Sequence, residues 1–265
     1  MRRIAVIIAA TLITLGFLTA CEPSPAPTAF PTAPPDATPA RALPCAIPAQ
    51  PPMSTPAPRS QMVEAVVVSI TDGDTIQVRI GGETRALRYI GVDAPERNQP
   101  GYAAATDANR ALVMGQTVWL EKDRSDADVY GRLLRYVWLA DGRMVNEEIV
   151  RAGYALAVTW QPDTRHRVRL EQAATEAWRE SRGFWAGGAG AFPYAMVAVN
   201  ALAIYTGPDE SQAVKAAAMC GDALAVYGRT ADGAWLQVRG PDRTGGWVRA
   251  IGVELAVPVD AVPVE

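Results

Sequence analysis

The chain has few side chains that bind soft metals and little net charge. Its 265 residues include 3 cysteines and 1 histidine, without a Cys-x-x-Cys pair or a Cys/His cluster, which argues against a zinc site. The formal net charge of −3 argues against a broad basic surface for nucleic acid. Because 15 of the 16 basic residues between positions 61 and 190 are arginines, we expect any phosphate recognition to be local, through guanidinium groups.

The apolar run near the N-terminus is too short for a comfortable membrane span, which takes about 20 residues. It covers residues 4–18 and follows Arg2 and Arg3, a pattern that predicts a signal peptide over residues 1–20. The run ends in Leu18-Thr19-Ala20-Cys21, which resembles the lipobox of bacterial lipoproteins, where the cysteine is lipidated. We therefore expect an exported, extracytoplasmic protein, lipid-anchored to the cell envelope through Cys21. An ordinary secretory signal or an N-terminal anchor helix is the alternative.

Proline is concentrated in residues 22–60, which hold 13 of the chain's 21 prolines. Proline fixes φ and removes a backbone donor, so no helix or inner strand is expected there. We predict a disordered to polyproline-like tether over this segment. Cys45 lies within it and Cys220 lies near the C-terminus. Export would permit a disulfide between the two, and free thiols or intermolecular pairing are the alternatives.

From residue 63 onward the pattern changes to strands and helices separated by turn residues. Strand patterns cover three segments of a meander and two later segments: 63–70, 75–80, 83–90, 116–121 and 133–139. Helical patterns cover 102–114, 145–152 and 165–181. Five strands with interspersed helices predict a β-rich α+β fold, a closed barrel of the oligonucleotide-binding (OB) type decorated by helices.

Three short strings gather carboxylates and arginines within this unit: Asp72-Gly73-Asp74-Thr75, Arg88-Tyr89-Ile90-Gly91-Val92-Asp93-Ala94-Pro95-Glu96 and Tyr130-Gly131-Arg132. Carboxylates bind hard divalent cations and arginines bind phosphate, a combination suited to phosphodiester hydrolysis. Together with the segments 141–147 and 150–153, these strings are similar to the staphylococcal nuclease family. The resemblance covers residues 63–187.

Asp74 and Asp93 are the candidate metal ligands. Asp74 ends a turn between two strands and Asp93 follows a strand, so neighbouring strands of a barrel can bring both carboxylates to one rim. The resemblance implies that the cation is Ca²⁺ and that the backbone carbonyl of Ala94 is a third ligand. Taken alone, Asp-Gly-Asp-Thr is typical of a simple turn, and it is the second string that favours a metal site.

Glu96 is the candidate general base, which would take a proton from a water aligned with the phosphorus. Arg88 and Arg132 are candidates for binding the oxygens on which charge develops during attack. The plain alternative for either arginine is a surface ion pair. The resemblance implies that water attacks and that the bond to the 5′ oxygen breaks, leaving 3′-phosphate products.

Two aromatic residues, Tyr130 and Trp160, are candidates for stacking on bases of a single strand. For Trp160 a place in the core is the alternative. The family commonly carries a lysine at the position of Val129 and a tyrosine at that of Val158, departures that bear on nucleotide contacts more than on catalysis. The single histidine, His166, is expected on a solvated helix face.

A second unit over residues 195–255 shows short strands between Gly, Pro and Asp turns. The patterns around Trp235 and Trp247 are similar to bacterial SH3-like domains, a small all-β barrel often used to bind cell wall or peptides. The leading prediction for the whole chain is an envelope-anchored, Ca²⁺-dependent endonuclease acting on DNA and RNA with little sugar or sequence specificity. The alternative is a catalytically inactive envelope protein that binds nucleic acid or cell wall.

Overall fold

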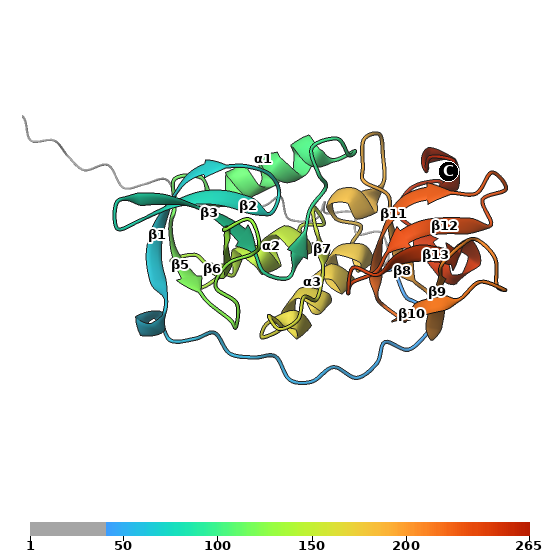
Figure 1. Ribbon diagram of the computed structural model, residues 1–265, viewed down its shortest axis with the longest axis horizontal. Coiled ribbons are helices and arrows are strands. Elements are labelled where there is room, and N and C mark those ends of the chain that lie inside the picture. The colour runs from blue at the N-terminus through green and yellow to red at the C-terminus, as the bar shows by residue number, and fades with distance from the viewer. Residues whose placement is uncertain (1–40) are drawn as a thin grey trace, which may run out of the picture.

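The computed structural model describes residues 41–265. The predicted signal segment and Cys21 lie outside the described residues. Figure 1 shows a barrel at one end of the molecule, a second β unit at the other, and α3 between them. None of the helices among residues 41–265 has the length and apolar character that a bilayer span requires.

The first unit is a closed five-stranded barrel. Its strands are β1 (Val63–Ile70), β2 (Thr75–Ile80), β3 (Glu83–Tyr89), β5 (Thr117–Glu121) and β6 (Leu133–Trp138). They follow the order β1-β2-β3-β6-β5, and pairing of β5 with β1 closes the barrel. All neighbours are antiparallel except β3 and β6, which run parallel. The predicted OB-type barrel is therefore confirmed, with strand ends within one residue of those expected.

Three helices cover the barrel: α1 (Tyr102–Val113), α2 (Val145–Arg151) and α3 (Arg167–Arg179). A two-stranded sheet of β4 (Val92–Asp93) and β7 (Leu156–Ala157), which the strand patterns do not predict, ties the second string to the segment before α3. A short 3₁₀ turn, η2 (Gly183–Ala186), follows α3. These elements share one apolar core in which Trp178, Trp185 and Tyr89 are fully buried.

The second unit is a seven-stranded antiparallel sheet. Its strands are β8 (Tyr194–Val197), β9 (Ala201–Tyr205), β10 (Val214–Met219), β11 (Ala223–Arg229), β12 (Trp235–Arg239), β13 (Gly245–Arg249) and β14 (Val253–Leu255). The order is β10-β9-β13-β12-β11-β8-β14, and two 3₁₀ turns, η3 (Ala250–Gly252) and η4 (Val259–Ala261), flank the last strand. An all-β C-terminal unit is thus confirmed, and its likeness to SH3 domains stays a prediction.

The two units pack against each other through apolar side chains. Phe192, Tyr194 and Met196 of the β8 region belong to the core of the nuclease-like unit, as do Ala223 and Ala225 of β11. The remaining apolar face of the sheet forms its own smaller core. Burial of large aromatic side chains at such a junction favours a fixed arrangement of the two units.

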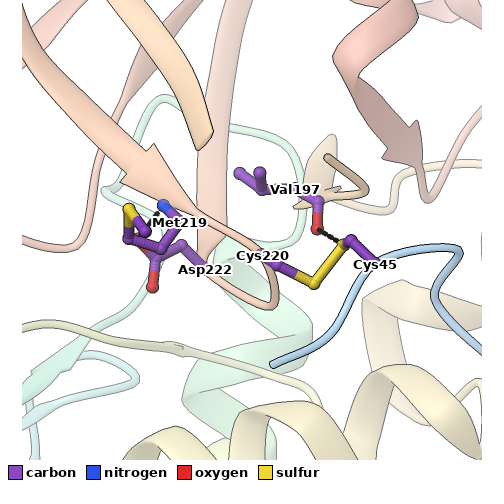
Figure 2. Close-up of a disulfide and its surroundings, with 5 residues drawn as sticks. All are labelled: Cys45, Val197, Met219, Cys220 and Asp222. Atoms are coloured by element: carbon purple, nitrogen blue, oxygen red, sulfur yellow. Dashed lines mark hydrogen bonds between the residues drawn. A yellow bond between two sulfur atoms is a disulfide. The ribbon is translucent and has the colours of Figure 1, made fainter. Parts of the chain in front are cut away.

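Residues 41–60, the described part of the tether predicted over residues 22–60, are bound to the folded body and do not form a free tether; residues 22–40 lie outside the described residues. Cys45 forms a disulfide with Cys220, 175 residues later in the chain, and Figure 2 shows the bridge beside Val197 of β8. From there the segment runs along the molecule to the 3₁₀ turn η1 (Arg59–Gln61) and β1 (Figure 1). Its proline content does exclude longer regular structure, but side-chain bonds to the folded body hold it in place. We call residues 41–60 the strap.

The strap is fastened to the barrel at several points. The Ser54 hydroxyl lies 2.8 Å from Nδ1 of His166 and donates to the Arg165 carbonyl at 2.5 Å. The Ala57 amide donates to the Glu121 carboxylate at 3.1 Å. Arg59 donates to the Ala140 carbonyl at 2.7 Å. These partners are far from the strap in sequence, so local composition could not reveal them.

Candidate active site

The turn between β1 and β2 brings Asp74, which belongs to the first string, into contact with Ala94 of the second string. The Asp74 amide donates to the Asp72 carboxylate at 3.0 Å, and the Ala94 amide donates to the Asp74 carboxylate at 2.7 Å. Gly73 is required between them because a Cβ there would lie 2.6 Å from the Cβ of Ala94. The first two strings therefore meet through backbone contacts, as a barrel rim allows.

Arg88 sits between the two candidate metal ligands. Its Nη1 lies 2.5 Å from Oδ1 of Asp74 and its Nη2 lies 3.3 Å from Oδ1 of Asp93. All three side chains are at most 6% exposed. Burial raises the pKa of Asp74, and the Arg88 guanidinium acts against that shift. Two buried carboxylates side by side require nearby positive charge, and in this structure arginines supply it.

An open cleft of about 410 Å³ gathers most of the predicted site residues. It is lined by Asp72, Asp74, Arg88, Glu96, Tyr130, Arg132, Trp160 and Arg243. All three strings contribute to it, although they are separated by up to about 60 residues in sequence. Asp93 and Ala94 do not line this cleft but a separate small pocket, where Arg239 lies 2.6 Å from one Asp93 carboxylate oxygen and Arg88 lies 3.3 Å from the other. Sequence reasoning therefore found six of the eight lining residues, missing Asp72 as a lining residue and Arg243 altogether.

The third string forms an exposed loop at the cleft. The Asp128 carboxylate accepts from Nε of Arg132 at 2.6 Å and from the Tyr130 and Arg132 amides at 2.9 and 3.0 Å. Gly131 has φ of 78°, a conformation that glycine adopts without strain. Tyr130 is 82% exposed, and its ring is contacted by the Arg132 guanidinium 5.5 Å from the centroid. Tyr130 thus offers a free aromatic face to a ligand.

Glu96 and Trp160 occupy the other parts of the cleft. The Glu96 amide donates to the Gln99 side chain at 2.7 Å, which fixes the loop, and the side chain is exposed. No ion pair or hydrogen bond engages the Glu96 carboxylate within residues 41–265, which leaves it available to a water. Trp160 is half-buried, with the Arg88 guanidinium 5.2 Å from its ring centroid.

His166 is not on a solvated face, and this prediction is wrong. Its side chain is fully buried, with Nε2 3.0 Å from the Glu121 carboxylate and the ring edge-on to Tyr136. The charged neighbours in sequence suggested exposure. The buried partners come from β5 and β6, so only the fold reveals that the histidine is a structural residue beneath the strap.

The residues present fit a hard cation in their donor chemistry. Asp74 and Asp93 are buried oxygen donors on either side of Arg88, and Asp72 and Glu96 line the cleft together with Asp74. No cluster of three or more His, Cys, Asp or Glu side chains forms a ready-made metal cage among residues 41–265. A cation here would therefore rely on two carboxylates completed by carbonyls and waters, which such ions accept.

A closed five-stranded barrel whose rim gathers carboxylates and guanidinium groups fits a nuclease domain of the OB type. The staphylococcal nuclease homologue family model matches residues 86–187. The chain is 37% identical to the thermonuclease of Staphylococcus hyicus over 125 residues, which cover 45% of this chain and 73% of the relative. It is 36% identical to the thermonuclease of Staphylococcus intermedius over 126 residues (45% and 74%), and 33% identical to endonuclease YncB of Bacillus subtilis over 141 residues (49% and 66%). The chain belongs to the staphylococcal nuclease family.

Proposed function

We propose that this protein is a Ca²⁺-dependent endonuclease that hydrolyses phosphodiester bonds of DNA and RNA with little sugar or sequence specificity. The observation that carries the proposal is the cleft in which the carboxylates and arginines of all three strings converge. The names of its thermonuclease and endonuclease relatives support it.

In the proposed mechanism the strand lies across the cleft with its scissile phosphate beside Arg88 and Arg132. Glu96, whose carboxylate has no partner in the cleft, accepts a proton from the attacking water. Arg88 and Arg132 donate to the non-bridging oxygens as negative charge builds on them. Ca²⁺, held by Asp74, Asp93 and the Ala94 carbonyl, would supply further positive charge at the phosphate when bound.

Tyr130 and Trp160 are proposed to bind bases by stacking. Stacking tolerates every base because each has a π-face, which accounts for low sequence specificity. Tyr130 is exposed on its loop, whereas Trp160 is half-buried and its ring is already contacted by the guanidinium groups of Arg88 and Arg243. We therefore expect Tyr130→Ala to weaken substrate binding while leaving the unfolding midpoint unchanged.

Glu96→Gln tests the proposal directly. The full chain is assayed for cleavage of fluorogenic single-stranded DNA and RNA, with Ca²⁺ and with chelator, beside the variant. We expect cleavage only with Ca²⁺ and a fall in kcat of about 100- to 10,000-fold in the variant, because general-base catalysis contributes on that order. Glu83→Gln, at the exposed β2–β3 turn, is the matched control. Full activity in chelator would refute the metal assignment, and no cleavage by folded wild-type protein would favour a binding protein.

We also propose that the protein is exported and anchored to the membrane of the cell envelope through lipidated Cys21. The Cys45–Cys220 disulfide supports export, because disulfides persist in oxidising compartments. Metabolic labelling with a fatty acid analogue tests the anchor: we expect label on the wild-type chain and none on Cys21→Ser. Equal labelling of both chains would rule out this anchor. Cell-wall binding by residues 195–255 stays a prediction.

A further inference from the structure

The C-terminal sheet reaches into the nuclease cleft through the turn between β12 and β13. Of the residues that line the cleft, Arg243 alone comes from this sheet. Within the turn, the Gly240 amide donates to the Thr244 carbonyl at 3.0 Å and the Arg243 amide to the Gly240 carbonyl at 2.9 Å. The Asp242 carboxylate accepts from the Thr244 amide at 2.9 Å. The turn is therefore well ordered by its own hydrogen bonds.

Two contacts fix this turn against the nuclease unit. The Thr159 amide donates to the Pro241 carbonyl at 2.7 Å. Arg239, at the end of β12, pairs with Asp93 at 2.6 Å and is one-quarter exposed. These contacts hold the turn next to Trp160. Arg243, at the tip of the turn, is therefore fixed in position before a ligand binds, as a preorganised binding group requires.

Arg243 differs from the other two arginines of the cleft in having no acidic partner. Arg88 pairs with Asp74 and Asp93, and Arg132 pairs with Asp128. No ion pair engages Arg243 within the described part of the chain. Its side chain is exposed, and its guanidinium lies 4.8 Å from the centroid of the Trp160 ring. The guanidinium is thus oriented by an aromatic face and left with its donors free.

The backbone of Arg243 gives a second indication. Its φ is +65°, a left-handed conformation that glycine adopts more readily than arginine. The turn also contains Gly240, yet the strained position carries the long cationic side chain of Arg243. Unfavourable backbone conformations of this kind concentrate at ligand-binding sites.

We propose that Arg243 binds a backbone phosphate of the nucleic-acid strand next to the scissile phosphate, so that the C-terminal sheet completes the substrate site of the nuclease. Arg243 lines the same cleft as Arg88 and Arg132, and both Arg243 and Arg88 contact the Trp160 ring, at 4.8 and 5.2 Å from its centroid. This inference rests on the proposed nuclease function, in which Arg88 and Arg132 bind the scissile phosphate. It assigns the second unit a direct part in holding substrate.

Arg243→Ala in the full chain tests the inference, with Arg249→Ala as the matched control. Arg249 is an exposed arginine of the same sheet that contacts Trp235 and does not line the cleft. For an oligonucleotide we expect Arg243→Ala to raise KM about tenfold with kcat unchanged, since a charge-assisted hydrogen bond is lost. The slope of log KM against log salt should fall by about 0.7, the value for one phosphate contact to a single strand. Arg243→Lys should keep the salt slope, and Arg249→Ala should change neither quantity.

A small chromogenic phosphodiester, which lacks flanking phosphates, separates the two positions. Its hydrolysis should be the same in wild-type protein and Arg243→Ala. Equal loss on both substrates would place Arg243 at the scissile phosphate, and no loss on either would remove it from the site; each result overturns the inference while leaving the nuclease standing.

Binding provides a readout that does not depend on catalysis. Fluorescence anisotropy with a labelled single-stranded DNA oligonucleotide is measured in the Glu96→Gln background, with and without Arg243→Ala. We expect about tenfold weaker binding in the double variant. If wild-type protein fails to cleave but this difference appears, the nuclease proposal fails and the phosphate site stands. If Arg243→Ala binds as tightly as its parent, the phosphate site fails.

Discussion

The nuclease unit and the C-terminal sheet differ in where their charged side chains lie: the first buries several of them, and the second does not. Among residues 41–265, every buried charged side chain lies between Asp74 and His166, in the nuclease unit, and none lies in residues 194–265. Buried charges cost several kcal/mol each unless paired and hydrogen-bonded. The nuclease unit pairs them at the cleft and around Glu121, and also where Glu147 meets Arg151 and Arg169 and where Arg135 meets Asp126. The sheet instead has an apolar core, brings the exposed Arg243 to the cleft and pairs the one-quarter exposed Arg239 with Asp93.

This difference separates two ways of building a site. In the barrel, the carboxylates and Arg88 are held rigidly because leaving any one unpaired is costly. In the sheet, Arg239 and Arg243 extend from the end of a hairpin, and their loss would leave the sheet's own core intact. We therefore expect changes in the barrel to affect stability and catalysis together, and changes in the sheet to affect substrate or ion binding more than folding.

The largest expected effect is that of Arg88→Met. Removing this guanidinium leaves Asp74 without its ion-pair partner and Asp93 with only Arg239. We expect the unfolding free energy to fall by about 3–5 kcal/mol, the usual cost of removing one partner of a buried ion pair. Urea unfolding at neutral pH measures it, beside Arg249→Met. Equal stability of the two variants would contradict the contrast between barrel and sheet.

The next largest effect is expected on opening the Cys45–Cys220 bridge, which ties the strap to the sheet. The bridge closes a loop of about 175 residues, so its removal should cost about 2–4 kcal/mol by freeing the unfolded chain. Paired Cys→Ser changes and reduction of the wild-type protein should lower the unfolding midpoint equally. No strap residue lines the cleft, so kcat should be retained. An unchanged midpoint after reduction would show that the bridge adds nothing.

A smaller, pH-dependent effect is expected at Glu121. Burial disfavours its charged form, but hydrogen bonds from His166, the Ala57 amide and Arg165 lower its pKa from 4.5 to about 2. A lowered folded-state pKa means that the stabilisation is present above the unfolded pKa and is lost as pH falls from about 4.5 to about 2. We expect a loss on the order of 2–3 kcal/mol across that range.

Glu121→Gln provides the comparison for that measurement. The amide keeps the shape of the side chain but carries no charge, so its unfolding free energy should vary less between those pH values than that of the wild-type protein. Parallel pH profiles for the two proteins, measured by urea unfolding, would remove Glu121 as the source of the dependence.

The smallest effect on folding is expected for Arg239→Ala, which cuts the ion pair between the two units. Asp93 keeps Arg88 as a partner, so we expect a loss of about 1 kcal/mol, as for a partly exposed pair. Calorimetric titration with Ca²⁺ sharpens the comparison: removing a positive charge beside Asp93 should tighten Ca²⁺ binding, because the two cations repel. Unchanged affinity would separate Asp93 from the metal site.

Much of the barrel could be predicted because local patterns and tertiary structure agree there. The three meander strands and α1 begin at the expected residues, since each is bounded by turn chemistry or glycine. The sequence did not indicate β4 and β7, which are two residues long and exist only because Val92 and Asp93 meet Leu156 and Ala157. Strands this short have no period to detect.

The candidate site was predictable where its residues lie in recognisable strings, and Asp74, Arg88, Glu96, Tyr130, Arg132 and Trp160 do line one cleft. Arg239 and Arg243 were not predicted, because nothing around Gly240 marks a phosphate contact. The exposure of His166 was predicted wrongly because its arginine neighbours suggested a solvated helix start. The His166 side chain instead packs inward against Glu121 and Tyr136. Partners distant in sequence decide such cases.

By itself, the sequence determined the chemistry of this protein: its strand and turn patterns specify a barrel, and its three strings specify carboxylates and guanidinium groups suited to a phosphodiester. Only the tertiary structure decided how the strap and the second unit contact that barrel. It closed the strap over His166 through a disulfide and brought an arginine of the second unit to the cleft. The physical reason is that periodicity and turn chemistry act over a few residues. Ion pairs, disulfides and shared cores join residues that meet only when the chain has folded.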